Sequence, residues 1–255
     1  MKNSIYNIIR KIIGFLQKHV SRRHEDFPFY ILIFAAFVVF LVALNLFAEL
    51  SDEILESSGQ AFDTRVTDYV LSFRTEALTN FFIIITDMGK FYAYLIMAAV
   101  VCVFLFLKFK NWKFILQLLA VTILSALSNV ALKLFFDRAR PSIEHLVSVE
   151  TLSYPSGHAM AAMAFYGFLI YLLFHIKMSK WLRWLLCVVF VVFIFLVGMS
   201  RIYLGVHFPS DVAGGFIAGL IWVAFCIVLF NVIALFQRKR ARKHPEETEK
   251  ELENP

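Results

Sequence analysis

Two histidines and one aspartate in the second half of the chain have the types and spacing of a phosphoryl-transfer site. His207 lies in the stretch SRIYLGVHFPSD, residues 200–211, and Asp211 follows it by four residues, about one helical turn. A carboxylate at that distance can hold one imidazole nitrogen and leave the other free to attack phosphorus. His158 follows the stretch YPSG and has no obvious carboxylate neighbour in the sequence. We therefore expect His207 to be the nucleophile and His158 the acid that protonates the departing oxygen.

Basic side chains close to these histidines could hold the phosphate. Phosphoryl transfer depends mainly on cations and N–H groups placed around the phosphate oxygens. Lys133 and Arg140 are seven residues apart in the stretch KLFFDRARP, so a continuing helix would place them on one face. Pro141 disfavours helical geometry at Arg140 and is expected to mark the helix exit. Arg201 precedes His207 and adds a third cation.

The stretch YPSGH, residues 154–158, has the features of a helix start that binds an anion. Ser156 suits a helix N-cap, and Gly157 lets a ligand approach the backbone. The free N–H groups at a helix start favour a negatively charged oxygen. No metal-ligand spacing is visible, and we expect neither a metal nor a cofactor. The expected phosphate-binding residues are Lys133, Arg140, Ser156, Gly157 and Arg201.

The elements that must position these residues are those of an all-α membrane protein. Of the 255 residues, 60% are hydrophobic and 29 are Phe. A bilayer-spanning helix needs roughly 20 mostly apolar residues, and six runs in the sequence predict a polytopic protein with six transmembrane helices. In the last run, the spacing of Gly215 and Gly219 fits close helix packing, within the chain first and between copies second. The runs are residues 29–48, 91–107, 114–132, 157–174, 184–199 and 212–236.

The distribution of basic residues predicts the orientation of these helices, because short cytoplasmic loops carry an excess of Lys and Arg. The two ends of the chain and the connections at residues 108–113 and 177–183 together hold 18 of the 25 basic residues. Both termini are therefore expected in the cytoplasm. The three motifs then face the extracytoplasmic side of the plasma membrane, where a cluster of cations requires an anionic partner. The net charge of +6 needs no nucleic acid to explain it.

Three further segments complete the expected domain organisation. Residues 1–28 carry apolar side chains at helical spacing and are expected to lie along the inner membrane surface. Residues 51–88 are expected to be extracytoplasmic and contain an amphipathic helix, which lies either on the outer membrane surface or over the loops. Residues 237–255 are charged and expected to be disordered. A single phosphatase domain, residues 29–236, lies between the two ends.

The three motifs, taken together, resemble the signature of a known enzyme family. K-x6-RP is present at residues 133–141, PSGH at residues 155–158 and SR-x5-H-x3-D at residues 200–211. In this order and with these spacings they are similar to the motifs of the type 2 phosphatidic acid phosphatase superfamily. The resemblance covers residues 133–211 directly. The family's six-span architecture, with the site at the outer membrane surface, agrees with the topology expected from charge.

The resemblance implies a metal-independent hydrolase that works through a phosphohistidine. His207 would be the nucleophile, Asp211 its orienting partner and His158 the general acid. The family also includes glucose-6-phosphatases and vanadium haloperoxidases, and here the membrane spans favour a lipid substrate. The residues that would hold the phosphate are Lys133, Arg140, Ser156, Gly157 and Arg201.

Each charged residue also has a plainer interpretation when it is taken singly. Lys133 could extend from a helix end to the membrane interface, and Arg140, Arg201 and Asp211 could be interfacial charges or structural ion pairs. An ionisable group near the bilayer centre costs roughly 2.5–3.5 kcal/mol, and less toward the ends of a span. That cost permits these residues at the interface but does not explain their pattern. Arg138 stays ambiguous, because it could contact a second phosphate, the neighbouring aspartate or lipid headgroups.

The sequence thus predicts a lipid phosphatase of the plasma membrane that removes a terminal phosphate at the outer leaflet. Candidate substrates are phosphatidylglycerol phosphate, undecaprenyl pyrophosphate, phosphatidate and lipid A phosphates. One alternative is a lipid phosphotransferase that passes the same phosphohistidine group to another lipid. Another is a non-catalytic relative that binds or translocates lipids, and the intact His158 and His207 argue against it.

Overall fold

The computed structural model describes residues 26–56, 59–110, 112–148 and 152–243, and every regular element within them is a helix. The all-α class is therefore confirmed for this part of the chain. The amphipathic segment expected before residue 26 and the last twelve residues of the charged tail lie outside the described residues. The helices are α2 (Phe27–Leu55), α3 (Gln60–Leu71), α4 (Glu76–Asp87), α5 (Phe91–Phe109), α6 (Lys113–Phe136), α7 (Gly157–Leu173), α8 (Lys180–Tyr203) and α9 (Pro209–Lys243).

Each of the six predicted spans corresponds to one of these helices. Within the described residues, four helices are long and apolar enough to cross a membrane, namely α2, α6, α8 and α9. Helices α4 and α5 pass the same test together as one span broken by a bend of 56°, which gives up to five. Helix α7 is apolar but has only 17 residues. The chain is a multi-pass membrane protein by this measure, and the number of six spans stays a prediction.

Large apolar side chains are exposed along these helices. Phe34 in α2, Leu107 in α5, Leu134 in α6 and Trp181 in α8 are examples. A water-soluble protein rarely exposes apolar surface on this scale, because the surface would drive association. In a bilayer the same side chains contact lipid tails, while the helices satisfy their backbone groups internally.

The described residues belong to two compact units. In the unit of residues 1–39 and 224–255, the guanidinium of Arg238 lies 4.3 Å from the ring centre of Phe29. This cation–π contact joins the beginning of α2 to the end of α9. Helix α9 continues to Lys243, so the first part of the charged tail is helical. The other unit, residues 40–223, contains all of the motif residues.

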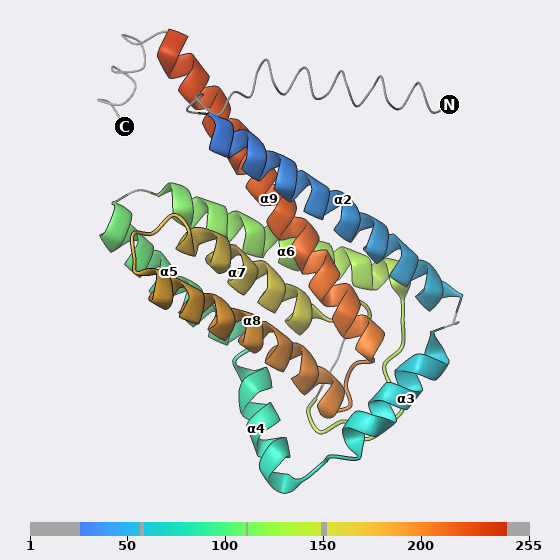
Figure 1. Ribbon diagram of the computed structural model, residues 1–255. Helices are drawn as coiled ribbons and strands as arrows, with labels where there is room; N and C mark the ends of the chain where they lie inside the picture. The colour runs from blue at the N-terminus through green and yellow to red at the C-terminus, as the bar shows by residue number, and fades with distance from the viewer. Residues whose placement is uncertain (1–25, 57–58, 111, 149–151, 244–255) are drawn as a thin grey trace, which may run out of the picture. The chain divides into compact units, whose positions relative to one another are not determined.

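Helix α7 is the most enclosed helix of the unit of residues 40–223, and it packs between α6 and α8 (Figure 1). Ten of its residues are buried. A Cβ atom added at Gly215 or Gly219 of α9 would lie only 2.6 Å from the carbonyl oxygen of Ser156 or Met160. The two glycines therefore allow α9 to approach α7 closely, which confirms the prediction of packing within the chain.

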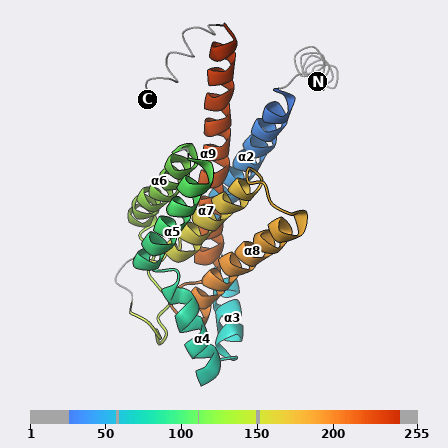
Figure 2. The ribbon, with the colours of Figure 1, turned by 90° about the vertical axis from the view of Figure 1, so that its left-hand side faces the viewer.

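The alternating course of the helices brings four helix ends together. Helices α6 and α8 end near the points where α7 and α9 begin, and the three motifs lie at these ends. Pro209 begins α9, a position that suits its fixed φ angle and missing N–H group. Helices α3 and α4 pack against α8, and both views place them at this end of the unit (Figures 1 and 2).

Helix α3 directs polar side chains toward the protein and aromatic side chains away from it. Asp63 and Thr67 are buried, whereas Phe62 and Tyr69 are about two-thirds exposed, at 63% and 66%. A surface helix of a water-soluble protein has the reverse arrangement. The helix packs against the protein through the contacts of Asp63 with Ser210 of α9 and with Arg138, while its placement on the outer membrane surface stays a prediction. The aromatic face is suited to a membrane surface.

Candidate active site

His207 and Asp211 form the most deeply buried pair of the site. His207 lies in the short connection between α8 and α9, and Asp211 lies in the first turn of α9. The Nδ1 atom of His207 is 3.4 Å from the Oδ2 atom of Asp211, so the two residues are in contact as the spacing predicted. The same carboxylate oxygen accepts hydrogen bonds from the Phe208 N–H at 2.8 Å and from the Ser153 hydroxyl at 2.5 Å. These contacts fix the carboxylate that faces the imidazole.

The second ring nitrogen of His207 faces a guanidinium. Nη1 of Arg140 is 3.1 Å from Nε2 of His207. A guanidinium can only donate, so Nε2 must accept, and the ring proton belongs on Nδ1 beside Asp211. Burial lowers the pKa of His207 to about 4, although the Asp211 carboxylate opposes that shift. The ring is therefore neutral at physiological pH and has a lone pair on Nε2.

Lys133 and Arg140 converge on one backbone oxygen. The carbonyl of Leu152 accepts a hydrogen bond from Nζ of Lys133 at 2.6 Å and one from Nη2 of Arg140 at 3.3 Å. The two residues do not share a helical face, because the helix does not continue to Arg140: α6 ends at Phe136, five residues before Pro141, and Asp137 adopts a left-handed conformation with φ of 46°. The two cations meet because the connection after α6 folds back over the helix end. Burial lowers the pKa of Arg140.

Ser156 and Gly157 occupy the start of α7, where the sequence placed them. The Ser156 N–H donates to the backbone oxygen of Asp211 at 2.9 Å, which joins the second motif to the third. Ser156 is at the N-cap position, but its hydroxyl makes no capping hydrogen bond, so this part of the prediction is wrong. Its Oγ is buried and has no hydrogen-bond partner among the described residues. A Cβ on Gly157 would lie 2.9 Å from Oδ1 of Asn129, so a larger residue here would require the Asn129 side chain of α6 to move.

His158 and Arg201 also carry buried nitrogens without partners. Neither Nε2 of His158 nor Nε of Arg201 has a hydrogen-bond partner among the described residues. Nη1 of Arg201 does donate to the hydroxyl of Thr86 in α4, at 2.5 Å. His158 lies close enough to Arg201 and His207 to interact electrostatically with both. Buried polar atoms normally have partners, so these two nitrogens are available to pair with a bound water or ligand.

The structure thus brings the three catalytic candidates and the phosphate-binding candidates into one region. Their cations, hydroxyl group and helix start are complementary to the oxygens of a tetrahedral anion. Within the described residues, no group of three or more His, Cys, Asp or Glu side chains could hold a metal ion.

Several residues at the site were not predicted from the sequence. Ser153 supports Asp211, Thr86 holds Arg201, and Gly89 leaves room for the ring of His158. The signal for Ser153 was its position in a polar stretch directly before the PSGH motif. Thr86 and Gly89 gave no such signal, because each lies in or after α4, far from the motifs in sequence.

Comparisons with known proteins agree with this arrangement. The family model described as the PAP2 superfamily matches residues 114–234, which include all three motifs. Over 205 residues, the chain is 32% identical to phosphatidylglycerophosphatase B of Bacillus subtilis, covering 80% of this chain and 95% of that protein. The chain belongs to the PAP2 superfamily. The PAP2 match begins in α6, so Asp63, Thr86 and Gly89 lie outside it.

Two solved structures resemble the fold. One is the crystal structure described as the first transmembrane PAP2 type phosphatidylglycerolphosphate phosphatase from Bacillus subtilis. It matches with a TM-score of 0.70 and 30% identity, covering 75% of this chain and 95% of that one. The other is LpxE from Aquifex aeolicus, with a TM-score of 0.53, 25% identity, and coverage of 64% of this chain and 93% of that one.

Proposed function

We propose that this protein is a lipid phosphatase of the plasma membrane that hydrolyses a phosphomonoester or pyrophosphate of a lipid through a phosphohistidine. The observation that carries the proposal is the pairing of His207 with Asp211 beside buried nitrogens of His158 and Arg201 that have no partner in the described part of the chain. The contact with Asp211 prepares His207 as a nucleophile, and the nitrogens of His158 and Arg201 are complementary to phosphate oxygens. The membership in the PAP2 superfamily and the named activities of its relatives support the same reaction.

In the proposed mechanism, Nε2 of His207 attacks phosphorus, and the bond between phosphorus and the lipid oxygen breaks. Asp211 holds the Nδ1 proton and stabilises the positive charge that develops on the ring. His158 gives a proton to the departing oxygen. Water then attacks the phosphohistidine and gives a proton to His158, the bond between Nε2 and phosphorus breaks, and inorganic phosphate is released with both histidines restored. Lys133, Arg140 and Arg201 neutralise the phosphate oxygens in both steps.

Arg140 has a particular place in this mechanism. Its guanidinium donates to the nitrogen that would attack, so a bound phosphate takes over this hydrogen bond, which frees the Nε2 lone pair and places the phosphate beside it. The carbonyl of Val206 accepts from the same Nη1 atom at 2.6 Å and fixes the guanidinium beside the imidazole. We therefore assign Arg140 to orientation of the scissile phosphate as well as to charge neutralisation.

The proposed reaction takes place at the extracytoplasmic face. The site lies where α6 and α8 end, and the basic connections at residues 108–113 and 177–183 precede the opposite ends of the same helices. Since basic connections mark the cytoplasmic side, the site would face the other side. Phosphatidylglycerol phosphate is the first substrate to test, because the relatives from Bacillus subtilis are named for it.

The test is a panel of phosphate-release assays on purified protein with phosphatidylglycerol phosphate, undecaprenyl pyrophosphate, phosphatidate and a lipid A phosphate. We expect release of inorganic phosphate in step with substrate loss for at least one of them, and no release by the His207→Ala protein. Phosphate release is expected to persist in EDTA. Loss of substrate without free phosphate would indicate transfer to another lipid. Failure to release phosphate from all four would contradict the proposal.

A further inference from the structure

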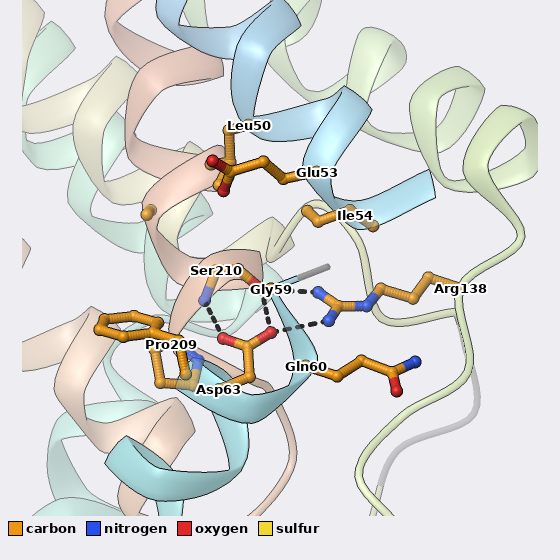
Figure 3. Close-up of a pocket in the computed structure, with 11 residues that line it drawn as sticks. Leu50, Glu53, Ile54, Gly59, Gln60, Asp63, Arg138, Pro209 and Ser210 are labelled. Carbon is orange, nitrogen blue, oxygen red and sulfur yellow. Dashed lines mark hydrogen bonds and ion pairs between the residues drawn. The ribbon is translucent and has the colours of Figure 1, made fainter. Parts of the chain in front are cut away.

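The carboxylate of Asp63 is buried far from the motifs in sequence but reaches the start of α9. Its side chain is 2% exposed. Oδ1 accepts from the Ser210 N–H at 2.9 Å, and Oδ2 accepts from the Ser210 hydroxyl at 2.5 Å. Figure 3 shows the carboxylate between Ser210 and Arg138, in the wall of a cavity of about 160 Å³. Asp63 thus fixes helix α3 to the residue that precedes Asp211.

Arg138 joins this carboxylate to the one at the active site. Its Nη2 atom lies 2.7 Å from Oδ2 of Asp63, and its Nη1 atom lies 2.6 Å from Oδ1 of Asp211. The guanidinium also lies over the ring of Phe208, 4.7 Å from the ring centre. A planar guanidinium with fixed donor directions holds two carboxylates in a defined geometry. Arg138 therefore pairs with carboxylates, which decides against its assignment to a second phosphate.

The two oxygens of Asp211 divide their contacts. Oδ1 faces Arg138, while Oδ2 faces His207, Ser153 and the Phe208 N–H. Rotation of the carboxylate about its Cβ–Cγ bond would disturb both sets at once. Arg138 consequently acts together with Ser153 and the Phe208 N–H to orient the oxygen that holds the Nδ1 proton of His207.

We propose that Asp63 is a positioning residue for the reaction: it holds Arg138, which orients the Asp211 carboxylate against His207. Asp63 touches neither the imidazole nor the phosphate, so it acts through Arg138. The inference rests on the proposed phosphatase function and adds helix α3, which lies outside the region matched by the PAP2 model, to the parts that build the site.

The first test is the Asp63→Asn variant, assayed by phosphate release on the lipid that the wild-type protein hydrolyses fastest. Asn has the shape of Asp but would place either a donor or a neutral oxygen against the donors of Arg138 and Ser210. We expect kcat to fall about tenfold with KM nearly unchanged, because the substrate contacts remain. The matched control is Asp68→Asn, the same change at an exposed position of the same helix, and it should keep wild-type kcat.

A double-mutant cycle with Arg138→Gln separates positioning from general destabilisation of α3. If Asp63 acts through Arg138, the Asp63→Asn change should cause little further loss of kcat in the Arg138→Gln protein. If the double variant instead loses kcat by the product of the two single losses, the substitutions act independently and the inference is wrong. A wild-type kcat in the folded Asp63→Asn protein would also overturn it. A wild-type protein that hydrolyses none of the lipids would instead contradict the proposed function.

If the Asp63→Asn protein does not fold, the Arg138→Lys variant tests the same contact. Lysine retains the positive charge but not the two-pronged geometry that contacts both carboxylates. We expect kcat to fall about tenfold with KM nearly unchanged in a protein that elutes as wild type from size exclusion. An unchanged kcat would overturn the inference.

Discussion

The two histidines of the site have opposite hydrogen-bond environments. Both ring nitrogens of His207 face side chains of the protein, Asp211 and Ser153 on one side and Arg140 on the other. The Nε2 atom of His158, by contrast, is buried without a partner in the described part of the chain. A nucleophile gains from being fixed before the substrate arrives, because its attack depends on orientation. An acid must give its proton to the substrate, so its hydrogen-bond partner is the departing oxygen.

The largest effect that tests this comparison is expected from His207→Ala. Without the attacking nitrogen no phosphohistidine can form, and we expect phosphate release to fall by roughly 10³-fold or more. The measurement is release from the best lipid substrate, with trapping of the phosphorylated protein by rapid acid or alkaline quench. The elution and melting temperature of the variant should match those of the wild type. A phosphorylated intermediate in the folded variant would contradict the assignment of the nucleophile.

The next effect is expected from His158→Ala and should depend on the leaving group. A lipid alkoxide needs a proton to depart, so we expect a loss of roughly 10²-fold on the lipid. Nitrophenolate departs without protonation, and a loss below about tenfold is expected on nitrophenyl phosphate. The ratio of the two losses measures the role of the acid. Equal losses on both substrates would mean that His158 is not the acid.

A smaller effect of the same kind is expected from Gly89→Ala. A Cβ at Gly89 would lie 2.8 Å from Cδ2 of His158 and 3.1 Å from the carbonyl of Thr86. The ring of His158 must therefore move, and we expect the rate on the lipid to fall about tenfold, with a smaller fall on nitrophenyl phosphate. The control is Gly59→Ala, where no atom lies within 4 Å of the added Cβ. A wild-type rate in Gly89→Ala would show that the ring position is not critical.

The smallest expected effect is the pH dependence that His207 gives to the stability of the folded protein. Its pKa is lowered to about 4 in the folded protein, against about 6.5 for an ordinary histidine. Between about pH 4 and about pH 6.5, His207 binds a proton in the unfolded chain but not in the folded protein. The group therefore lowers the stability of the folded state as pH falls from about 6.5 to about 4, and has no such effect above about 6.5.

Two measurements check this expectation. The loss of kcat/KM that comes from protonation of His207 should appear only near pH 4, so His207 itself should cause little loss of activity between pH 7 and about pH 5. The melting temperature of the wild type should fall more steeply with acid than that of His207→Gln, whose side chain does not titrate. An acid limb near pH 6.5 would contradict the lowered pKa.

The motif residues could be predicted from the sequence because they lie in short stretches and carry distinctive chemistry. His207 and Asp211 are one turn apart, and Lys133 and Arg140 flank one helix end. The apolar runs also predicted that the three motifs lie on one side of the membrane, because consecutive spanning helices alternate in direction. Ser156 shows the limit of this reasoning. A serine before a helix predicts a capping hydroxyl, and in this site the hydroxyl makes no capping bond.

The supporting residues could not be predicted, because their partners are distant in sequence and their types are common. Asp63 contacts Ser210 across 147 positions, and Thr86 contacts Arg201 across 115. Threonine and glycine have many local uses in helices and turns, so neither type indicates a partner by itself. Helix α2 likewise extends beyond its apolar run to Leu55, and the Ser51 hydroxyl in this extension lies 3.0 Å from the Tyr154 hydroxyl.

The inverted polarity of helix α3 has a consequence for protein engineering. Asp63 and Thr67 point inward while Phe62 and Tyr69 point outward, so neighbouring positions of one helix serve the active site and the apolar exterior. A redesign that exchanges lipid-facing side chains for charged ones, to obtain a protein that dissolves without detergent, would remove the difference in polarity between the two faces that opposes rotation of this helix. Rotation would withdraw Asp63 from Arg138. We therefore expect that a detergent-free variant will lose turnover unless the aromatic face of α3 is kept or shielded.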